Sequence, residues 1–107
     1  MAWLRVLVRD AAHRRPYDYT TKRTVTVGRD AHANVVLGTP GVSTYHLLFE
    51  REKGSDDWDV RDRGSKNGTL VGGRALPPGQ PIRVPPRCWM QIGATGLEVF
   101  GRRPLQR

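Results

Sequence analysis

Apolar and polar residues alternate with a period of two along much of this chain, the pattern of strands that each bury one face. The first example is Leu4, Val6 and Val8, which are separated by Arg5 and Leu7. The alternation returns later, at Val25 and Val27, Trp58 and Val60, Ile82 and Val84, Met90 and Ile92, and Leu97 and Val99. Every run is short and is bounded by Gly, Pro, Asp, Asn or Ser. The pattern predicts an all-β domain, an antiparallel sandwich or barrel of about nine to eleven short strands.

The stretch 74–87 contains five prolines around Ile82 and Val84. Since proline cannot donate to a central ladder, we expect edge strands and turns here. The chain has 107 residues, enough for one domain. After Phe100 it becomes basic and loses the alternation. We therefore expect one domain at residues 1–101 and a basic C-terminal tail at residues 102–107.

Several protein classes are excluded by composition. No apolar run approaches the length of about 20 residues that crosses a bilayer, and charges interrupt the start of the chain before a signal-peptide core could form. The single cysteine, Cys88, has no internal disulfide partner, and the three histidines have no metal-ligand spacing. We therefore expect a cytoplasmic domain with no cofactor, no metal and no membrane insertion, and the preference for arginine hints at a bacterial origin.

The formal net charge is +8, and the basic excess lies toward the two ends of the chain with an acidic middle. Such a charge raises the possibility of nucleic-acid binding. That function would require aromatic side chains among basic ones on an exposed sheet face, but most of the eight aromatic residues fall at expected core positions. We therefore expect no nucleic-acid partner.

Two local clusters follow predicted strands. Gly28-Arg29 ends the strand at 23–27; the glycine allows a sharp turn and places the arginine on a loop. The segment 41–46 contains Ser43 and His46 before the strand at 47–51. A catalytic Ser-His pair would need an orienting carboxylate and an oxyanion site, and these two side chains would point to opposite faces of a strand. A serine that donates a hydrogen bond and a buried histidine that braces the loop fit the sequence better.

A third cluster is Asp62-Arg63-Gly64-Ser65-Lys66-Asn67-Gly68-Thr69. Asn-Gly is a strong signal for a tight turn. A Walker-type phosphate loop is excluded, because Gly-Lys followed by Ser or Thr and then a helix is missing.

These three clusters, in this order and in an all-β domain of this length, resemble the forkhead-associated (FHA) family over residues 3–100. The resemblance implies an FHA/SMAD-like two-sheet antiparallel β-sandwich of about eleven strands that binds phosphothreonine peptides through loops at one end. It assigns phosphopeptide binding to five residues: Arg29, Ser43, Thr44, Lys66 and Asn67. It assigns structural support of that site to Gly28, His46 and Gly68. The implied function is a non-enzymatic recognition module that links an upstream Ser/Thr protein kinase to a partner or parent protein.

Two positions depart from the family pattern. Thr44 stands where the family often has arginine, and Lys66 stands where a small hydroxyl residue is common. Our hypothesis is that Lys66 restores the missing positive charge from the opposite loop. The alternatives are an FHA-like scaffold that binds proteins without phosphate and a basic β-domain that binds nucleic acid.

Overall fold

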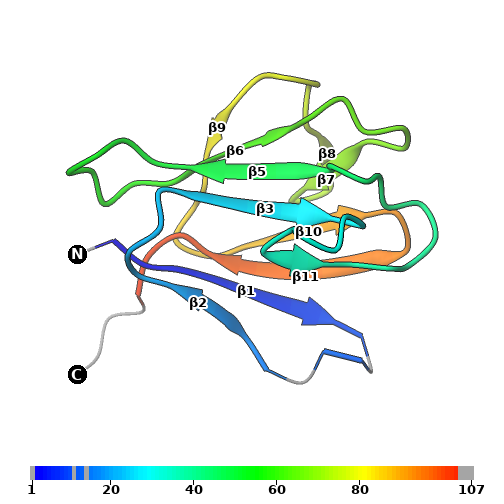
Figure 1. Cartoon of the computed structure of the whole chain (residues 1–107). Helices are drawn as coiled ribbons and strands as arrows, with labels where there is room; N and C mark the ends of the chain where they lie inside the picture. Colours follow the sequence, from blue (N-terminus) through cyan, green and yellow to red (C-terminus); the bar gives the residue numbers. More distant parts are fainter. Residues whose placement is uncertain (1, 11, 14, 104–107) are drawn as a thin grey trace.

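The computed structural model describes residues 2–10, 12–13 and 15–103 and shows two β-sheets packed against each other (Figure 1). The six-stranded sheet has the order β2 (Tyr17–Tyr19), β1 (Leu4–Arg9), β11 (Thr95–Phe100), β10 (Cys88–Ile92), β7 (Thr69–Val71), β8 (Arg74–Ala75). The five-stranded sheet has the order β4 (Val35–Val36), β3 (Thr24–Gly28), β5 (Leu47–Glu50), β6 (Asp59–Asp62), β9 (Ile82–Arg83). The predicted all-β class and the two-sheet sandwich are confirmed, and no helix occurs in the described ranges.

One strand pair is parallel rather than antiparallel. β3 pairs with β4 through Val27 opposite Val35 and Gly28 opposite Val36. Parallel neighbours usually need a long crossover, but here the side chain of Asn34 fixes a short one. The Asn34 side-chain Oδ1 accepts from the backbone amide of Thr26 at 2.9 Å. The backbone amide of Asn34 donates to Thr26 Oγ1 at 3.0 Å. This connection returns the chain to the end of β3, beside Arg29.

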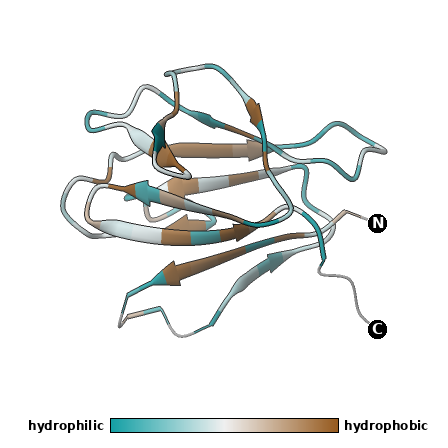
Figure 2. Cartoon of the chain, turned by 180° about the vertical axis from the view of Figure 1, so that it is seen from behind, coloured by the Kyte–Doolittle hydropathy of each residue, from teal (hydrophilic) through white to brown (hydrophobic). Residues whose placement is uncertain are grey.

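The core lies between the two sheets and contains the residues that the alternation predicted. Leu4, Val6 and Val8 of the six-stranded sheet are buried. From the other sheet, Phe49 of β5 is buried, and so is Trp58, which directly precedes β6. Burying such side chains stabilises the fold by about 1.5–3 kcal/mol each. Figure 2 shows hydrophobic segments concentrated in the strands and mostly hydrophilic loops between them.

The proline-rich segment forms β8 and β9, each at an edge of its sheet. β1 begins beside the end of β11, because Arg5 lies opposite Phe100. Of the expected tail 102–107, Arg102 and Arg103 contact the domain, whereas residues 104–107 lie outside the described residues. In the part of the chain that is described, no helix has the length and apolar character that crossing a membrane requires.

Candidate functional site

A cavity of about 610 Å³ opens among the loops at one end of the sandwich. The end of β3, from which one of these loops starts, lies on the right in Figure 1. We call this cavity the loop cavity. Its walls are Arg29, Gly41, Val42, Ser43, Thr44, Tyr45, Lys66 and Asn67. All five residues to which the family resemblance assigned phosphopeptide binding therefore line one cavity, although they come from three separate loops: Arg29 follows β3, Ser43 and Thr44 precede β5, and Lys66 and Asn67 precede β7.

The segment carrying Ser43 and Thr44 is attached to the end of β3 by backbone hydrogen bonds. The Arg29 amide donates to the Ser43 carbonyl, and the Asp30 amide donates to the Thr44 carbonyl, both at 3.1 Å. Gly28 permits this approach, since a Cβ there would lie 2.2 Å from the Thr44 carbonyl oxygen. Gly28 does not adopt a left-handed conformation. Its role is thus close packing of two backbones, and not the sharp turn that its position suggested.

His46 joins two of the three loops that form the cavity. The buried imidazole accepts from the Ser43 amide at Nδ1, at 3.0 Å. Nε2 then carries the proton and donates to the Gly68 carbonyl at 2.9 Å. Both ring nitrogens are used by backbone groups, so the ring braces the loops and is not positioned as a base for the Ser43 hydroxyl.

Hydrogen-bond donors converge on the loop cavity. Ser43 Oγ accepts from the Lys66 amide at 3.0 Å, which leaves its own proton free to donate elsewhere. The Thr44 amide has no hydrogen-bond acceptor within the described ranges. The exposed side chains of Arg29 and Lys66 have no ion-pair partner there either. The cavity can therefore offer an oxygen-rich anion two cations and two neutral donors.

The turn after Lys66 places an amide side chain at the rim. Asn67 Nδ2 donates to the Gly41 carbonyl at 3.1 Å, so its Oδ1 remains available as an acceptor. Gly68 has φ of +80°, a left-handed conformation that glycine adopts without strain. Its amide donates to Ser65 Oγ at 2.9 Å, which closes the turn.

Asp62 stabilises this turn through hydrogen bonds, a role that the sequence analysis did not identify. Its buried carboxylate accepts from the Ser65 amide at 2.7 Å, from Ser65 Oγ at 2.6 Å and from Thr69 Oγ1 at 2.7 Å. Burial raises the pKa of Asp62, but the hydrogen bonds from Ser65 and Thr69 outweigh burial and hold the pKa below its ordinary value. The sequence did carry a signal for this role. The alternation of buried and exposed positions in β6 places Asp62 on the same buried face as Val60.

Two further features of the cavity also lay beyond the sequence analysis. Gly41 packs directly on Gly93 of the β10–β11 turn, where a Cβ on Gly41 would lie 2.9 Å from the Gly93 Cα.

Tyr45 forms part of the cavity wall, between the carboxylate of Asp30 and the guanidinium of Arg63. A hydrogen bond to Asp30 raises the pKa of the Tyr45 hydroxyl, and the Arg63 guanidinium lies 5.7 Å from the ring centroid.

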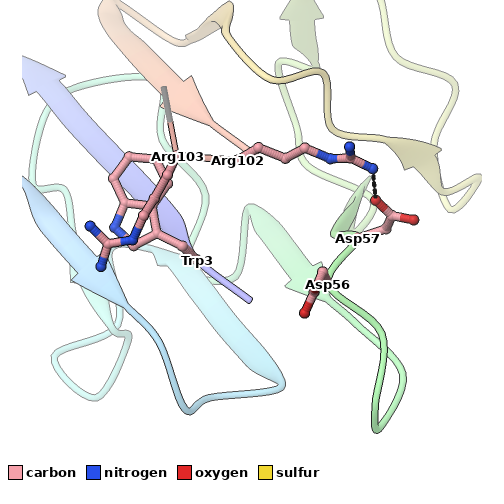
Figure 3. A pocket seen from close by; sticks show the side chains of 6 residues that line it. Trp3, Asp56, Asp57, Arg102 and Arg103 are labelled. Atoms are coloured by element: carbon pink, nitrogen blue, oxygen red, sulfur yellow. Dashed lines mark hydrogen bonds and ion pairs between the residues drawn. The ribbon is translucent and has the colours of Figure 1, made fainter. Parts of the chain in front are cut away.

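A second hollow of about 430 Å³ lies at the opposite end of the sandwich (Figure 3). Its charged groups are already paired: Arg102 contacts Asp57 at 2.6 Å, and Arg103 lies 5.2 Å from the centroid of the Trp3 ring. A charged ligand would have to displace these contacts. Elsewhere in the described ranges, no three metal-ligating side chains come together.

Comparisons with known proteins agree with this architecture. A family model described as the FHA domain matches residues 25–93. An FHA domain-containing protein of Arabidopsis thaliana is 40% identical over 62 residues, which make up 57% of this chain and 16% of that protein. The chain thus spans only about a sixth of this relative's length.

Solved structures match nearly the whole chain. The solution structure of an FHA domain from an Arabidopsis thaliana hypothetical protein is 27% identical, with a TM-score of 0.81. The match covers 99% of this chain and 92% of that one. An FHA domain studied for phosphothreonine-dependent interactions is 23% identical, with a TM-score of 0.78 over 97% of this chain and 100% of that one.

Proposed function

Because the chain belongs to the FHA domain family, we propose that it is a module that binds phosphothreonine-containing peptides in the loop cavity. Arg29, Ser43 and Lys66 hold the phosphate, together with the backbone amide of Thr44. Asn67 holds the peptide backbone beside the phosphorylated residue. Gly28, His46 and Gly68 keep the loops in place.

The observation that carries this proposal is the convergence of unpartnered donors in one cavity. A phosphothreonine brings a charge of about −1.5 to −2 and three strong acceptor oxygens. The free guanidinium of Arg29 and the free ammonium of Lys66 match that charge, while Ser43 Oγ and the Thr44 amide match the remaining lone pairs. Each charge-assisted hydrogen bond contributes about 1.5–3 kcal/mol. Two or three of them, with peptide contacts, correspond to affinity in roughly the micromolar range.

The position of Lys66 supports the compensation hypothesis. Its backbone amide is anchored to Ser43 Oγ, so the start of its side chain is fixed at the cavity wall. Thr44 contributes only a neutral side chain to the cavity. We propose that Lys66 supplies the second positive charge.

The biological setting that we propose follows from this chemistry. A phosphothreonine ligand requires a Ser/Thr protein kinase upstream, and the module itself performs no catalysis. The related FHA domain studied for phosphothreonine-dependent interactions is consistent with such a ligand. The link to a partner or parent protein, the domain limits 1–101, the cytoplasmic location and the bacterial origin stay predictions.

The test is a titration with matched peptides that carry phosphothreonine, phosphoserine or threonine at one position. We expect tight binding of the phosphothreonine peptide only. Arg29→Ala should weaken it by about 2 kcal/mol or more, roughly 30-fold, and Lys66→Ala by a smaller factor. Arg23→Ala, which removes an exposed arginine just before β3, controls for net charge and should leave affinity unchanged.

Each outcome bears on a different part of the proposal. Equal affinity for all three peptides, or no binding across a varied phosphothreonine library, would exclude the phosphothreonine module. Full affinity of Lys66→Ala, combined with loss in Arg29→Ala, would exclude the compensation by Lys66 alone.

A further inference from the structure

The outer face of the six-stranded sheet carries a third, smaller hollow that faces solvent. Trp89 of β10 is 49% exposed, and Leu70 of β7 is 42% exposed. With Gly73, Met90 and Gln91 they line a hollow of about 280 Å³, which we call the Trp89–Leu70 hollow. A single exposed apolar residue needs no explanation, but two that flank one hollow form a candidate contact surface.

Strand register explains why these side chains point outward. Met90 of β10 enters the core, so its neighbour Trp89 projects from the opposite face. Leu70 lies opposite Gln91 on the adjoining strand. Gln91 in turn lies opposite Gly96 of β11, which has no side chain to fill the surface. The indole of Trp89 therefore lies on the outer face, opposite Glu98, and not in the core between the sheets.

The rim of the hollow is positively charged. The Arg9 guanidinium lies 5.4 Å from the centroid of the Trp89 ring. Arg9 and Arg87 both pair with a single buried carboxylate, that of Glu98, so one positive charge remains in excess there.

We propose that the Trp89–Leu70 hollow is a protein-docking surface that receives one large apolar side chain flanked by acidic residues. A volume near 280 Å³ is below the about 300–1,000 Å³ of small-molecule sites and suits a single side chain. Tryptophan and arginine are the residues that most often carry binding energy at interfaces. The acidic flank follows from charge complementarity with the excess positive charge of Arg9 and Arg87 around Glu98.

A second copy of this chain and a single-stranded nucleic acid are both disfavoured as occupants, for different reasons. A second copy of this chain would bring the same basic rim and another net charge of +8. Single-stranded nucleic acid needs several exposed rings for stacking. On this face Trp3 is buried beneath Arg5 and Arg103, and Trp89 is the exposed ring.

This docking surface does not depend on phosphate recognition, because it shares no residue with the loop cavity. The test uses an unphosphorylated synthetic peptide with a central Leu-Phe pair between glutamates, titrated against isotope-labelled protein by NMR. We expect chemical-shift changes at the indole N–H of Trp89 and at the amides of Leu70 and Gly73. Two control peptides replace the glutamates by lysines or the Leu-Phe pair by Gly-Ser, and neither should bind.

Variants make the result specific. Trp89→Ala and Leu70→Ser should each lower affinity for the acidic peptide about tenfold or more. Arg9→Gln, which removes the guanidinium beside the Trp89 ring, should lower it less and weaken its salt dependence. Val36→Ala, an exposed valine on β4 of the other sheet, should not change it. Arg29→Ala should bind this peptide normally even if it no longer binds phosphopeptides.

The proposal is overturned if the acidic peptide at millimolar concentration shifts no resonance of Trp89 or Leu70. It is also overturned if the lysine peptide produces equal shifts. Shifts at Trp89 produced instead by a short oligothymidylate, with a steep salt dependence, would assign the face to nucleic acid.

Discussion

Replacing Gly28 with alanine would place a methyl group where the backbone of the next loop already lies. The new Cβ would be 2.2 Å from the Thr44 carbonyl oxygen, 2.9 Å from the Thr44 carbonyl carbon and 3.0 Å from the Ser43 carbonyl oxygen. These are backbone atoms, so no rotation of a side chain can relieve the contact. Either β3 or the segment carrying Ser43 and Thr44 must move.

The size of the effect follows from that geometry. The Thr44 oxygen must retreat by about 0.8 Å to reach even a tight contact. Overpacking of this kind costs about 1–3 kcal/mol, and the two hydrogen bonds from residues 29 and 30 each add about 0.5–1.5 kcal/mol when lost. We expect a loss of about 2–6 kcal/mol, a large share of the about 5–15 kcal/mol typical of a domain. It corresponds to a fall in Tm of roughly 10–25 °C.

The displacement should also reach the ligand. Ser43 and Thr44 would lie too far from a phosphate seated against Arg29 for good hydrogen bonds. We therefore expect the affinity for a phosphothreonine peptide to fall by about 2 kcal/mol or more, roughly 30-fold. Calorimetric titration at a temperature where the variant is still folded measures this change, and urea denaturation measures the stability.

Gly38→Ala is the matched control. Gly38 lies between β4 and the same loop, has no left-handed φ, and has no atom within 4 Å of an added Cβ. Its stability should stay within about 0.5 kcal/mol of the wild type. If Gly28→Ala matched Gly38→Ala in both measurements, the close-packing argument would be wrong. If it lost stability but kept full affinity, Gly28 would have no part in positioning the site.

Three other results are expected. The depressed pKa of Asp62 means that the unfolded chain takes up a proton first as pH falls. The stability advantage of wild type over Asp62→Asn should therefore be full near neutral pH and shrink as the pH falls past the ordinary carboxyl pKa of about 4; a pH-independent difference would contradict this. His46→Ala should lower the free energy of unfolding by about 2–4 kcal/mol and weaken phosphopeptide binding, because the Ser43 amide loses its buried acceptor. A variant as stable as wild type would show that the imidazole ring does not brace the loops. Burial raises the pKa of Cys88 to about 11, so iodoacetamide should alkylate it slowly at pH 8 in the folded protein and rapidly in urea, and equal rates would refute its protection.

The strand pattern was predictable from the sequence for a physical reason, whereas the site residues were proposed from a family resemblance. Alternation at Leu4, Val6 and Val8 reports directly which face of a strand is buried, and it identified the core correctly. Arg29 and Ser43 could be placed in one site because their motifs resemble those of a known family. Spacing alone would not have joined two loops whose contact depends on the whole sandwich.

Other features depend on contacts between distant segments. The parallel pairing of β3 with β4 rests on the side chain of Asn34, and no local pattern distinguishes it from an ordinary loop asparagine. The packing of Gly41 on Gly93 unites turns that are half the chain apart. Alternation showed that Trp89 and Met90 face opposite sides of a strand, but only the assembled sheet shows that the side with Trp89 is open to solvent.

The pairing of the start of β1 with the end of β11 has a practical consequence. Arg5 lies opposite Phe100. The start of β1 lies at the left in Figure 1, whereas the end of β3, which leads into the loops of the cavity, lies at the right. A tag, a dye or a resin linker attached before β1 or after β11 is therefore directed away from the cavity. Molecules immobilised through either end should all present the same face to a peptide in solution, which suits the domain to capture reagents and sensor surfaces.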